Sequence, residues 1–226
     1  MKPFTSAVIL AAGSATRMKG TDKIMLPVNG KPLIYYTIKA FELSDTIDEI
    51  IIVTRDEIKK EISKAVEDFN KIKDIVSGGS CRVVSAKNGF SAISKTSCFI
   101  AVHDGARPLI TPEDIDKINT KAYVCNAVCC GYPVTDTIKQ VDEKGIIIAT
   151  PDRSKLFAVA TPQVFSVDVY KKAIDNAMSC PQNFTDDSGM VEAVGVEVKT
   201  VLCKKNIKVT SPEDIEIIKF LTKSFQ

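Results

Sequence analysis

Short apolar runs rich in valine and isoleucine recur through the first half of the chain, at residues 7–11, 50–53 and 99–102. Each run is followed within two residues by glycine, threonine or aspartate. Runs of this length are too short for a helix, and strands covered on both faces of a sheet have continuous apolar sequences. The pattern therefore predicts buried, parallel strands.

Segments with helical periodicity lie between these runs. Residues 33–41 and 58–69 repeat apolar positions every three or four residues. Later in the chain the pattern predicts helices over 167–178 and after Ser211, and a strand over 198–202. Strand alternating with helix predicts an α/β fold, one domain over residues 1–226 with helices on both faces of its sheet. Such sheets bind ligands beyond the carboxyl ends of their strands.

The alternation breaks between residues 134 and 150. Two β-branched segments, 137–141 and 146–148, flank the sequence Asp142-Glu143-Lys144-Gly145, which is suited to a hairpin turn. We therefore predict a projecting β-arm at about 134–156. A two-stranded ribbon is only marginally stable alone, so its exposed β-branched residues favour packing on a second subunit.

Charge is nearly balanced along the chain, because 30 Lys and Arg against 28 Asp and Glu leave a net charge of +2. This balance gives no reason to expect nucleic acid or an anionic membrane as a partner. Seven cysteines without a CxxC pair, and a single histidine, support neither a disulfide framework nor a zinc site. The amino-terminal apolar run lacks the length of a membrane span and the layout of a signal peptide, so we expect a cytoplasmic protein.

The loop after the first predicted strand has the composition of a phosphate-binding loop. It reads Ala11-Ala12-Gly13-Ser14-Ala15-Thr16-Arg17-Met18 and is followed by Lys23. Small residues let backbone N–H groups approach an anion, while Arg17 and Lys23 supply positive charge for a triphosphate. The loop lacks GxxxxGK[ST] and GxGxxG, which argues against a P-loop ATPase and a dinucleotide-binding fold. The structural alternative is an ordinary turn with two surface cations.

Two further turns also follow predicted strands. One is Gly78-Gly79-Ser80-Cys81-Arg82-Val83-Val84-Ser85, and the other is His103-Asp104-Gly105-Ala106-Arg107-Pro108. Asp104, at a strand end, is placed to hold a Mg²⁺ ion that bridges phosphate oxygens, because Mg²⁺ usually takes only one or two protein carboxylates. The alternative is that Asp104 braces its own turn or pairs with Arg107.

Taken in order, these three loops resemble those of the 2-C-methyl-D-erythritol 4-phosphate cytidylyltransferase family. Five later segments resemble blocks of the same family: PVTDTIK at 133–139, Asp152-Arg153, ATPQ at 160–163, TDD at 185–187 and NIKVT at 206–210. The resemblance extends from residue 7 to about residue 214, and eight blocks in the family's order make it specific. The chain departs from the family's pattern at Ala15, Ile24 and Ser80, where glycine, glutamine and an acidic residue are common.

The resemblance implies a Rossmann-like nucleotidyltransferase fold and a homodimer that exchanges its β-arms. It also implies transfer of CMP from CTP to 2-C-methyl-D-erythritol 4-phosphate, giving CDP-methylerythritol and pyrophosphate for isoprenoid precursor synthesis. Mg²⁺ or another divalent cation is the implied cofactor. Two alternatives stay open: a ribitol 5-phosphate cytidylyltransferase, and a nucleotide-binding regulator without catalytic activity.

The site residues that the resemblance implies fall into three groups. Those expected to bind the nucleotide are Ala11, Ala12, Gly13, Gly79 and Ser85. Those expected to act on the phosphates in catalysis are Arg17, Lys23, Arg153 and Lys208. Those expected to bind the acceptor are Asp104, Thr137, Arg153, Thr185 and Lys208. Thr137 and Arg153 would come from the partner subunit, and Asp104 would be the metal ligand or bind the acceptor's hydroxyls. Without the resemblance, Arg153 is interpreted as an ion pair between arm and body, and Lys208 as a solvated charge.

Overall fold

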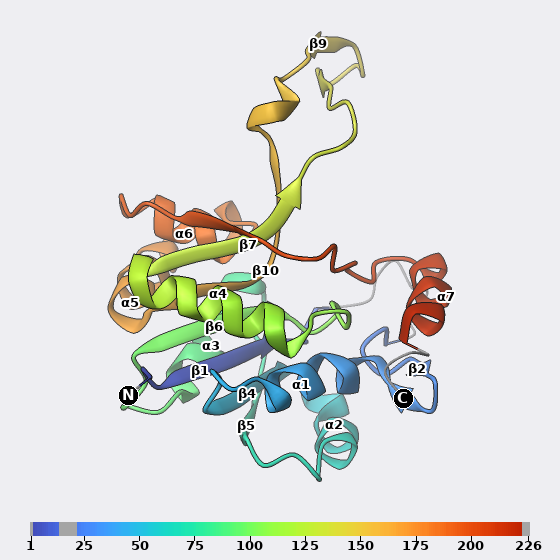
Figure 1. Ribbon diagram of the computed structural model, residues 1–226, viewed down its shortest axis with the longest axis vertical. Coiled ribbons are helices and arrows are strands. Elements are labelled where there is room, and N and C mark those ends of the chain that lie inside the picture. The colour runs from blue at the N-terminus through green and yellow to red at the C-terminus, as the bar shows by residue number, and fades with distance from the viewer. Residues whose placement is uncertain (1, 14–21, 223–226) are drawn as a thin grey trace.

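A seven-stranded sheet forms the centre of the computed structural model, which describes residues 2–13 and 22–222 (Figure 1). From edge to edge the strands are β11 (Lys199–Leu202), β7 (Ala127–Pro133), β10 (Phe157–Ser166), β6 (Phe99–Asp104), β1 (Thr5–Leu10), β4 (Glu49–Thr54) and β5 (Ile72–Ser77). β10 is antiparallel to both of its neighbours, and the other neighbouring pairs are parallel. The mostly parallel α/β sheet confirms the predicted fold class.

The three predicted apolar runs form neighbouring strands. β1 lies between β4 and β6, so that Val8 is paired with Ile51 on one side and with Val102 on the other. Every residue of β4 and β6 is buried. Because helices cover both faces of the sheet, these strands have no solvent-facing side, and the runs 50–53 and 99–102 within them are accordingly apolar.

Helices lie on both faces of the sheet. The core on one side involves α1 (Leu33–Leu43), α2 (Lys59–Ala65), α4 (Pro112–Cys125) and α7 (Pro212–Leu221), and that on the other involves α3 (Arg82–Ala92), α5 (Val167–Ala177) and α6 (Asp187–Glu192). Ala7 and Ile9 pack into the first core and Val8 into the second, because alternate side chains of a strand point to opposite faces. Short elements are β2 (Pro27–Val28), β3 (Lys31–Pro32) and the 3₁₀ helices η2 (Asp56–Ile58), η3 (Arg153–Lys155) and η4 (Pro181–Asn183). None of the helices in the described part of the chain is long and apolar enough to cross a membrane.

The helix predicted over 58–69 is shorter in the structure. Its α-helical part is α2, which η2 precedes and which ends at Ala65. The chain then turns and places the ring of Phe69 against that of Tyr35, with 5.2 Å between their centroids. The apolar residues of the predicted repeat do pack against the core, but Phe69, the last of them, lies beyond the end of the helix.

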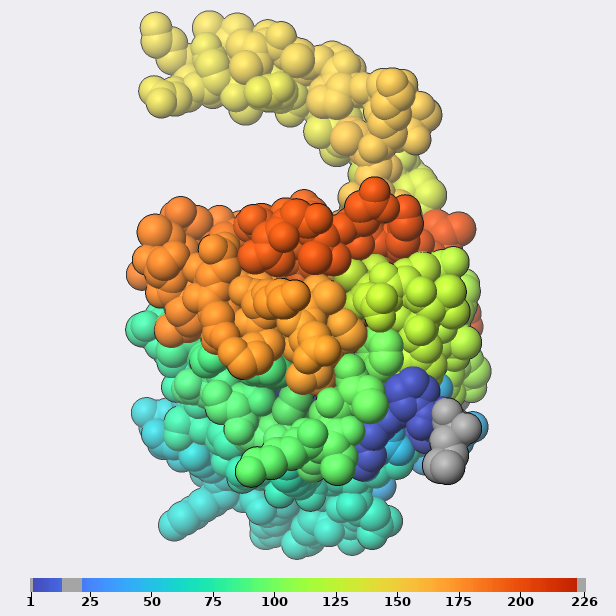
Figure 2. Space-filling view, turned by 90° about the vertical axis from the view of Figure 1, so that its left-hand side faces the viewer, coloured from blue at the N-terminus to red at the C-terminus, as the bar shows by residue number. Residues whose placement is uncertain are grey.

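The segment between β7 and β10 projects from the body as the predicted β-arm (Figure 1). Its paired strands are short, β8 (Gln140–Val141) and β9 (Ile147–Ala149), and the Asp142 carboxylate closes their turn by accepting the N–H groups of Lys144 and Ile146. In Figure 2 the arm overhangs the body, and open space separates its tip from the surface below. Near the tip, Ile146, Ile147 and Ile148 therefore stay more than half exposed.

Candidate active site

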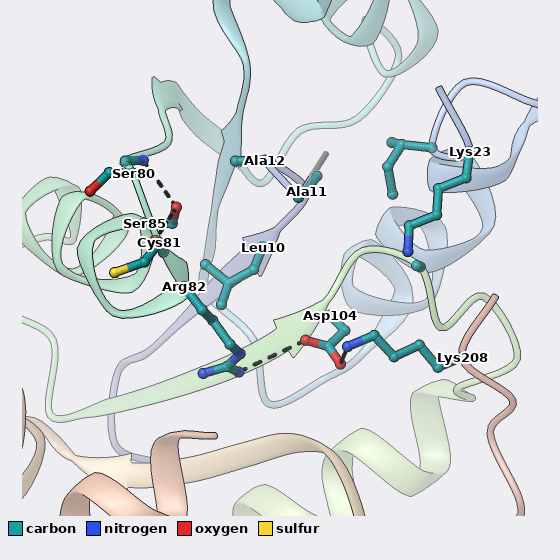
Figure 3. Close-up of a pocket in the computed structure, with 14 residues that line it drawn as sticks. Leu10, Ala11, Ala12, Lys23, Ser80, Cys81, Arg82, Ser85, Asp104 and Lys208 are labelled. Atoms are coloured by element: carbon teal, nitrogen blue, oxygen red, sulfur yellow. Dashed lines mark hydrogen bonds and ion pairs between the residues drawn. The ribbon is translucent and has the colours of Figure 1, made fainter. Parts of the chain in front are cut away.

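A cavity of about 490 Å³ opens at the carboxyl ends of β1 and β6, beside the amino end of α3 (Figure 3). It is lined by Leu10, Ala11, Ala12, Gly13, Lys23, Ile24, Gly79, Ser80, Cys81, Arg82, Ser85, Asp104, Ala106 and Lys208. All five residues predicted to bind the nucleotide are in this set, together with Lys23, Asp104 and Lys208. Residues from distant parts of the sequence thus meet at the edge of the sheet where α/β proteins bind ligands.

Small residues and backbone form the wall between β1 and α3. The Ala11 N–H donates to the Val53 carbonyl at 2.7 Å, which holds the start of the loop against β4. On the other side the Gly79 N–H donates to Ser85 Oγ at 3.0 Å. A Cβ on Gly79 would lie 2.1 Å from the side chain of Val84, so only glycine fits there. The result is a surface poor in side chains, against which a planar base can lie.

Lys23 enters the cavity from the opposite side (Figure 3). Its Nζ donates to the Val209 carbonyl at 3.1 Å. The Val209 N–H in turn donates to the Ala106 carbonyl at 2.8 Å. The segment that carries Lys208 is thereby tied to Lys23 and to the loop after β6, which brings two lysines to one end of the cavity.

Asp104, the last residue of β6, is surrounded by cations. Its Oδ2 lies 2.9 Å from Lys208 Nζ and 3.2 Å from Arg107 Nε. Its Oδ1 lies 3.8 Å from the guanidinium of Arg82 (Figure 3). Burial would raise the pKa of the Asp104 carboxyl, but the positive charges of Lys208 and Arg82 outweigh burial and hold that pKa well below its usual range. Asp104 therefore stays ionised and fixes the cations around it.

A second cavity of about 270 Å³ adjoins this cluster. It is lined by Arg82, Asp104, Arg107, Val159, Ala160, Thr161, Gln163, Thr185, Asp186 and Lys208. Arg82, Asp104 and Lys208 line both cavities and form their common boundary. Thr185, predicted to bind the acceptor, lines only the second cavity. A ligand in each cavity would approach the other at the three shared residues.

Arg82 and Asp187 form an ion pair that the sequence analysis did not assign. Arg82 NH2 lies 2.6 Å from Asp187 Oδ2, and Asp187 is fully buried. The Tyr170 hydroxyl donates to the other Asp187 oxygen at 2.8 Å. Both residues stand in blocks that the sequence makes conspicuous, the Gly78–Gly79 turn and the TDD segment. The sequence gives no sign that these two blocks meet.

His103 lies fully buried beside Asp104. Its Nε2 is 3.3 Å from the Arg107 carbonyl, which can only accept, so Nε2 carries the proton. The Thr161 hydroxyl accepts the Asp104 N–H at 3.0 Å and donates to His103 Nδ1 at 3.1 Å. Burial lowers the pKa of His103 to about 4, and the negative charge of Asp104 opposes that shift without cancelling it. His103 is therefore a neutral support beneath the loop rather than an acid or base for the cavity.

Two of the predicted site residues that the structure describes lie apart from the two cavities. Thr137 and Arg153 are on the arm and are not among the residues lining either cavity. Arg153 NH1 donates to the Thr135 carbonyl at 2.6 Å, a contact within the arm. Arg17 falls outside the described residues. Within one copy of the chain, the structure therefore does not bring Thr137 and Arg153 to the other predicted residues.

The surroundings of Asp104 do not fit a metal ion held by the protein. Both of its carboxylate oxygens face cationic side chains, which a metal ion would have to displace or repel. Across residues 2–13 and 22–222 no group of three or more His, Cys, Asp or Glu side chains is placed to hold a metal. Asp104 is suited to anchoring cations, and its predicted role as the Mg²⁺ ligand has no support from this arrangement.

Sequence comparison connects this arrangement to known proteins. The family model described as IspD: 2-C-methyl-D-erythritol 4-phosphate cytidylyltransferase matches residues 5–224. A protein of that name from Caldanaerobacter subterraneus subsp. tengcongensis is 45% identical over 217 residues, which cover 94% of this chain and 96% of the relative. Another, from Alkaliphilus metalliredigens, is 40% identical over 218 residues, covering 94% of this chain and 90% of the relative.

Solved structures agree with the sequence comparison. A 4-diphosphocytidyl-2C-methyl-D-erythritol synthase from Anaerococcus prevotii superposes with a TM-score of 0.88 at 28% identity, covering 98% of this chain and 96% of its own. The bifunctional IspDF from Campylobacter jejuni superposes with a TM-score of 0.77 at 26% identity, and the match covers 94% of this chain and 53% of that one. The chain belongs to the 2-C-methyl-D-erythritol 4-phosphate cytidylyltransferase (IspD) family.

Proposed function

We propose that this chain transfers CMP from CTP to 2-C-methyl-D-erythritol 4-phosphate, giving CDP-methylerythritol and pyrophosphate. The observation that carries the proposal is the pair of cavities that share Arg82, Asp104 and Lys208. CTP in the larger cavity and the acceptor in the smaller one would meet at this boundary, as direct transfer between two bound substrates requires. The names of the relatives supply the acceptor.

The chemistry needs no nucleophile from the protein. A phosphate oxygen of the acceptor attacks the α-phosphorus of CTP, and the bond from that phosphorus to the oxygen bridging to the β-phosphate breaks. Pyrophosphate leaves with the electron pair of that bond. The acceptor phosphate is largely ionised near neutral pH, so a strong general base is unnecessary. The barrier would be lowered by positioning and by positive charge, which Lys23 and Lys208 supply from fixed positions.

The divalent cation is proposed to enter with the nucleotide. Mg²⁺ prefers phosphate and water oxygens and is commonly held through substrate phosphates. When bound, it would neutralise charge on the triphosphate. We do not propose Asp104 as a ligand of this cation, because its Oδ2 already pairs with Lys208 and Arg107.

The arm is proposed to join two copies of the chain. Its Ile146, Ile147 and Ile148 side chains are 57–59% exposed, an apolar surface that a second subunit would cover. Thr137 and Arg153 project from the same arm and lie off both cavities of their own chain. Across a dimer they would reach the partner's acceptor cavity and bind the acceptor phosphate there, opposite Thr185.

Pyrophosphate release from CTP in the presence of Mg²⁺ tests the reaction. Three samples would contain 2-C-methyl-D-erythritol 4-phosphate, ribitol 5-phosphate or no acceptor. Release with the first acceptor alone is expected. Release with ribitol 5-phosphate alone would keep the chemistry and reject the acceptor, and tight CTP binding with no release in any sample would reject catalysis in favour of a regulator.

A further inference from the structure

Arg55 connects two points of the chain that are separated by the loop after β1. It directly follows β4, and its NH1 donates to the Gly13 carbonyl at 3.1 Å. Its NH2 forms an ion pair and hydrogen bond with Asp22. Gly13 and Asp22 are the described residues on either side of the segment 14–21. One guanidinium group therefore fixes the distance between these two points.

Asp22 uses its remaining polar groups to shape the turn that carries Lys23. While Oδ2 faces Arg55, Oδ1 accepts the Ile24 N–H at 3.1 Å. The Asp22 carbonyl accepts the Met25 N–H at 3.0 Å. Because Lys23 lies inside this turn, a shift of Asp22 would move the point from which Lys23 enters the nucleotide cavity.

Arg55 itself does not line that cavity. It lines a hollow of about 230 Å³ that shares Ala12 and Gly79 with the nucleotide cavity, whereas Gly13 and Lys23 line the nucleotide cavity and not the hollow. The Arg55 and Asp22 side chains are 29% and 15% exposed, so solvent only partly screens their pairing. The forked guanidinium can hold a carboxylate and a carbonyl together, which a lysine ammonium on a flexible stem does less well.

We propose that Arg55 is a positioning residue for CTP: by holding Gly13 and Asp22 it sets one wall of the nucleotide cavity and the entry point of Lys23 before the nucleotide binds. The inference rests on the proposed function. Groups that are fixed in advance lose less conformational freedom on binding, so affinity rises without a new contact. Gly13 and Lys23 line the nucleotide cavity and not the acceptor cavity, so the effect should fall on CTP alone.

Steady-state kinetics of Arg55→Ala, with each substrate varied in turn, test this selectivity. We expect kcat/KM for CTP to fall about tenfold or more, the scale of one lost hydrogen bond to a charged group. The KM for the acceptor should not change, and Arg55→Lys should recover only part of the loss. Glu57→Ala is the matched control, since Glu57 lies 3.9 Å from Arg55 Nε, is mostly exposed and contacts neither end of the loop. It should match wild type.

A double-mutant cycle with Asp22→Asn separates positioning from direct contact. If Arg55 acts through Gly13 and Asp22, the two substitutions together should cost little more than Arg55→Ala alone, because that variant already loses both contacts. Additive losses of kcat/KM for CTP would mean that Arg55 touches the nucleotide. An equal rise in both KM values, together with a lower unfolding temperature, would mean that Arg55 has a general structural role. Either result overturns the proposal. If wild type releases no pyrophosphate, the proposed function fails, and calorimetric CTP binding by the same variants still tests Arg55.

Discussion

The burial of His103 predicts a loss of folding stability at low pH, and the size of that loss can be calculated from the lowered pKa. It is the only histidine in the chain, is fully buried, and has a pKa of about 4 instead of the usual 6.5 because burial penalises its charged form. In the unfolded chain the imidazole takes up a proton below about pH 6.5, whereas in the folded protein it resists until about pH 4. Protonation therefore favours the unfolded state between these values. Stability that is fully present above pH 6.5 is lost as the pH falls toward 4.

The magnitude follows from linkage. A displacement of about 2.5 pKa units corresponds to about 3 kcal/mol when the whole window is crossed. Between about pH 7.5 and about pH 5 the same linkage gives a loss of about 2 kcal/mol from this one group. The neutral variant His103→Gln has no such proton, and the carboxylates that also titrate in this range are common to both proteins. The difference between the two pH profiles therefore isolates His103.

Two measurements check the prediction. NMR of the folded protein shows a single imidazole, whose titration midpoint should lie near 4. Urea unfolding at both pH values should show the wild type losing about 2 kcal/mol more than His103→Gln. A midpoint near 6.5, or parallel pH profiles for the two proteins, would refute the assignment of a buried neutral imidazole between Thr161 and the Arg107 carbonyl.

Three further predictions concern the cavities and the arm. Lys208→Ala should lower kcat by about a hundredfold, because it removes a donor that stabilises charge in the transition state. The control is Lys205→Ala, which removes a neighbouring lysine that lies over the Tyr132 ring and should leave kcat unchanged. Equal kcat values for the two variants would contradict a catalytic role for Lys208. Asp187→Ala should lower the free energy of unfolding by about 2 kcal/mol in urea titrations, because it leaves the buried Tyr170 hydroxyl without its acceptor and Arg82 with only the more distant Asp104. A loss below about 1 kcal/mol would contradict that reasoning. Serine at all three of positions 146–148 should give an inactive monomer by light scattering, and an active monomer would show that the arm supplies nothing to the site.

The sequence predicts the central strands and the loops at their ends because both depend on local pattern. β1, β4 and β6 are covered on both faces of the sheet, and the runs 7–10, 50–53 and 99–102 within them are apolar for that reason. The sequence pattern does not predict α3, because the glycine at position 89, inside the helix, weakens its helical pattern. The structure shows why a glycine stands there: a Cβ would lie 2.4 Å from Val8, so the missing side chain lets α3 pack closely on β1.

The sequence predicts part of the lining of the two cavities, and of the pairings there only that of Asp104 with Arg107, as an alternative. Lys23, Asp104 and Lys208 are conspicuous in sequence because cations and a carboxylate follow predicted strands or stand in family blocks. That Lys208 reaches Asp104, and that Arg82 reaches Asp187, depends on how the chain folds back on itself. Neither segment carries a local signal of its partner, so no pattern in the sequence could connect them.

The small net charge of the whole chain does not reflect the positive charge that is concentrated at the site. The net charge of +2 is small, yet the described residues that line the two cavities include four cations, Lys23, Arg82, Arg107 and Lys208, whereas the carboxylates beside them are three, Asp104, Asp186 and Asp187. The carboxylates hold cations that would otherwise repel one another and turn toward solvent. The remaining positive charge is then concentrated where two phosphate-bearing substrates would meet. Asp104 therefore serves the reaction best as a permanent anion, which is the state that its lowered pKa maintains.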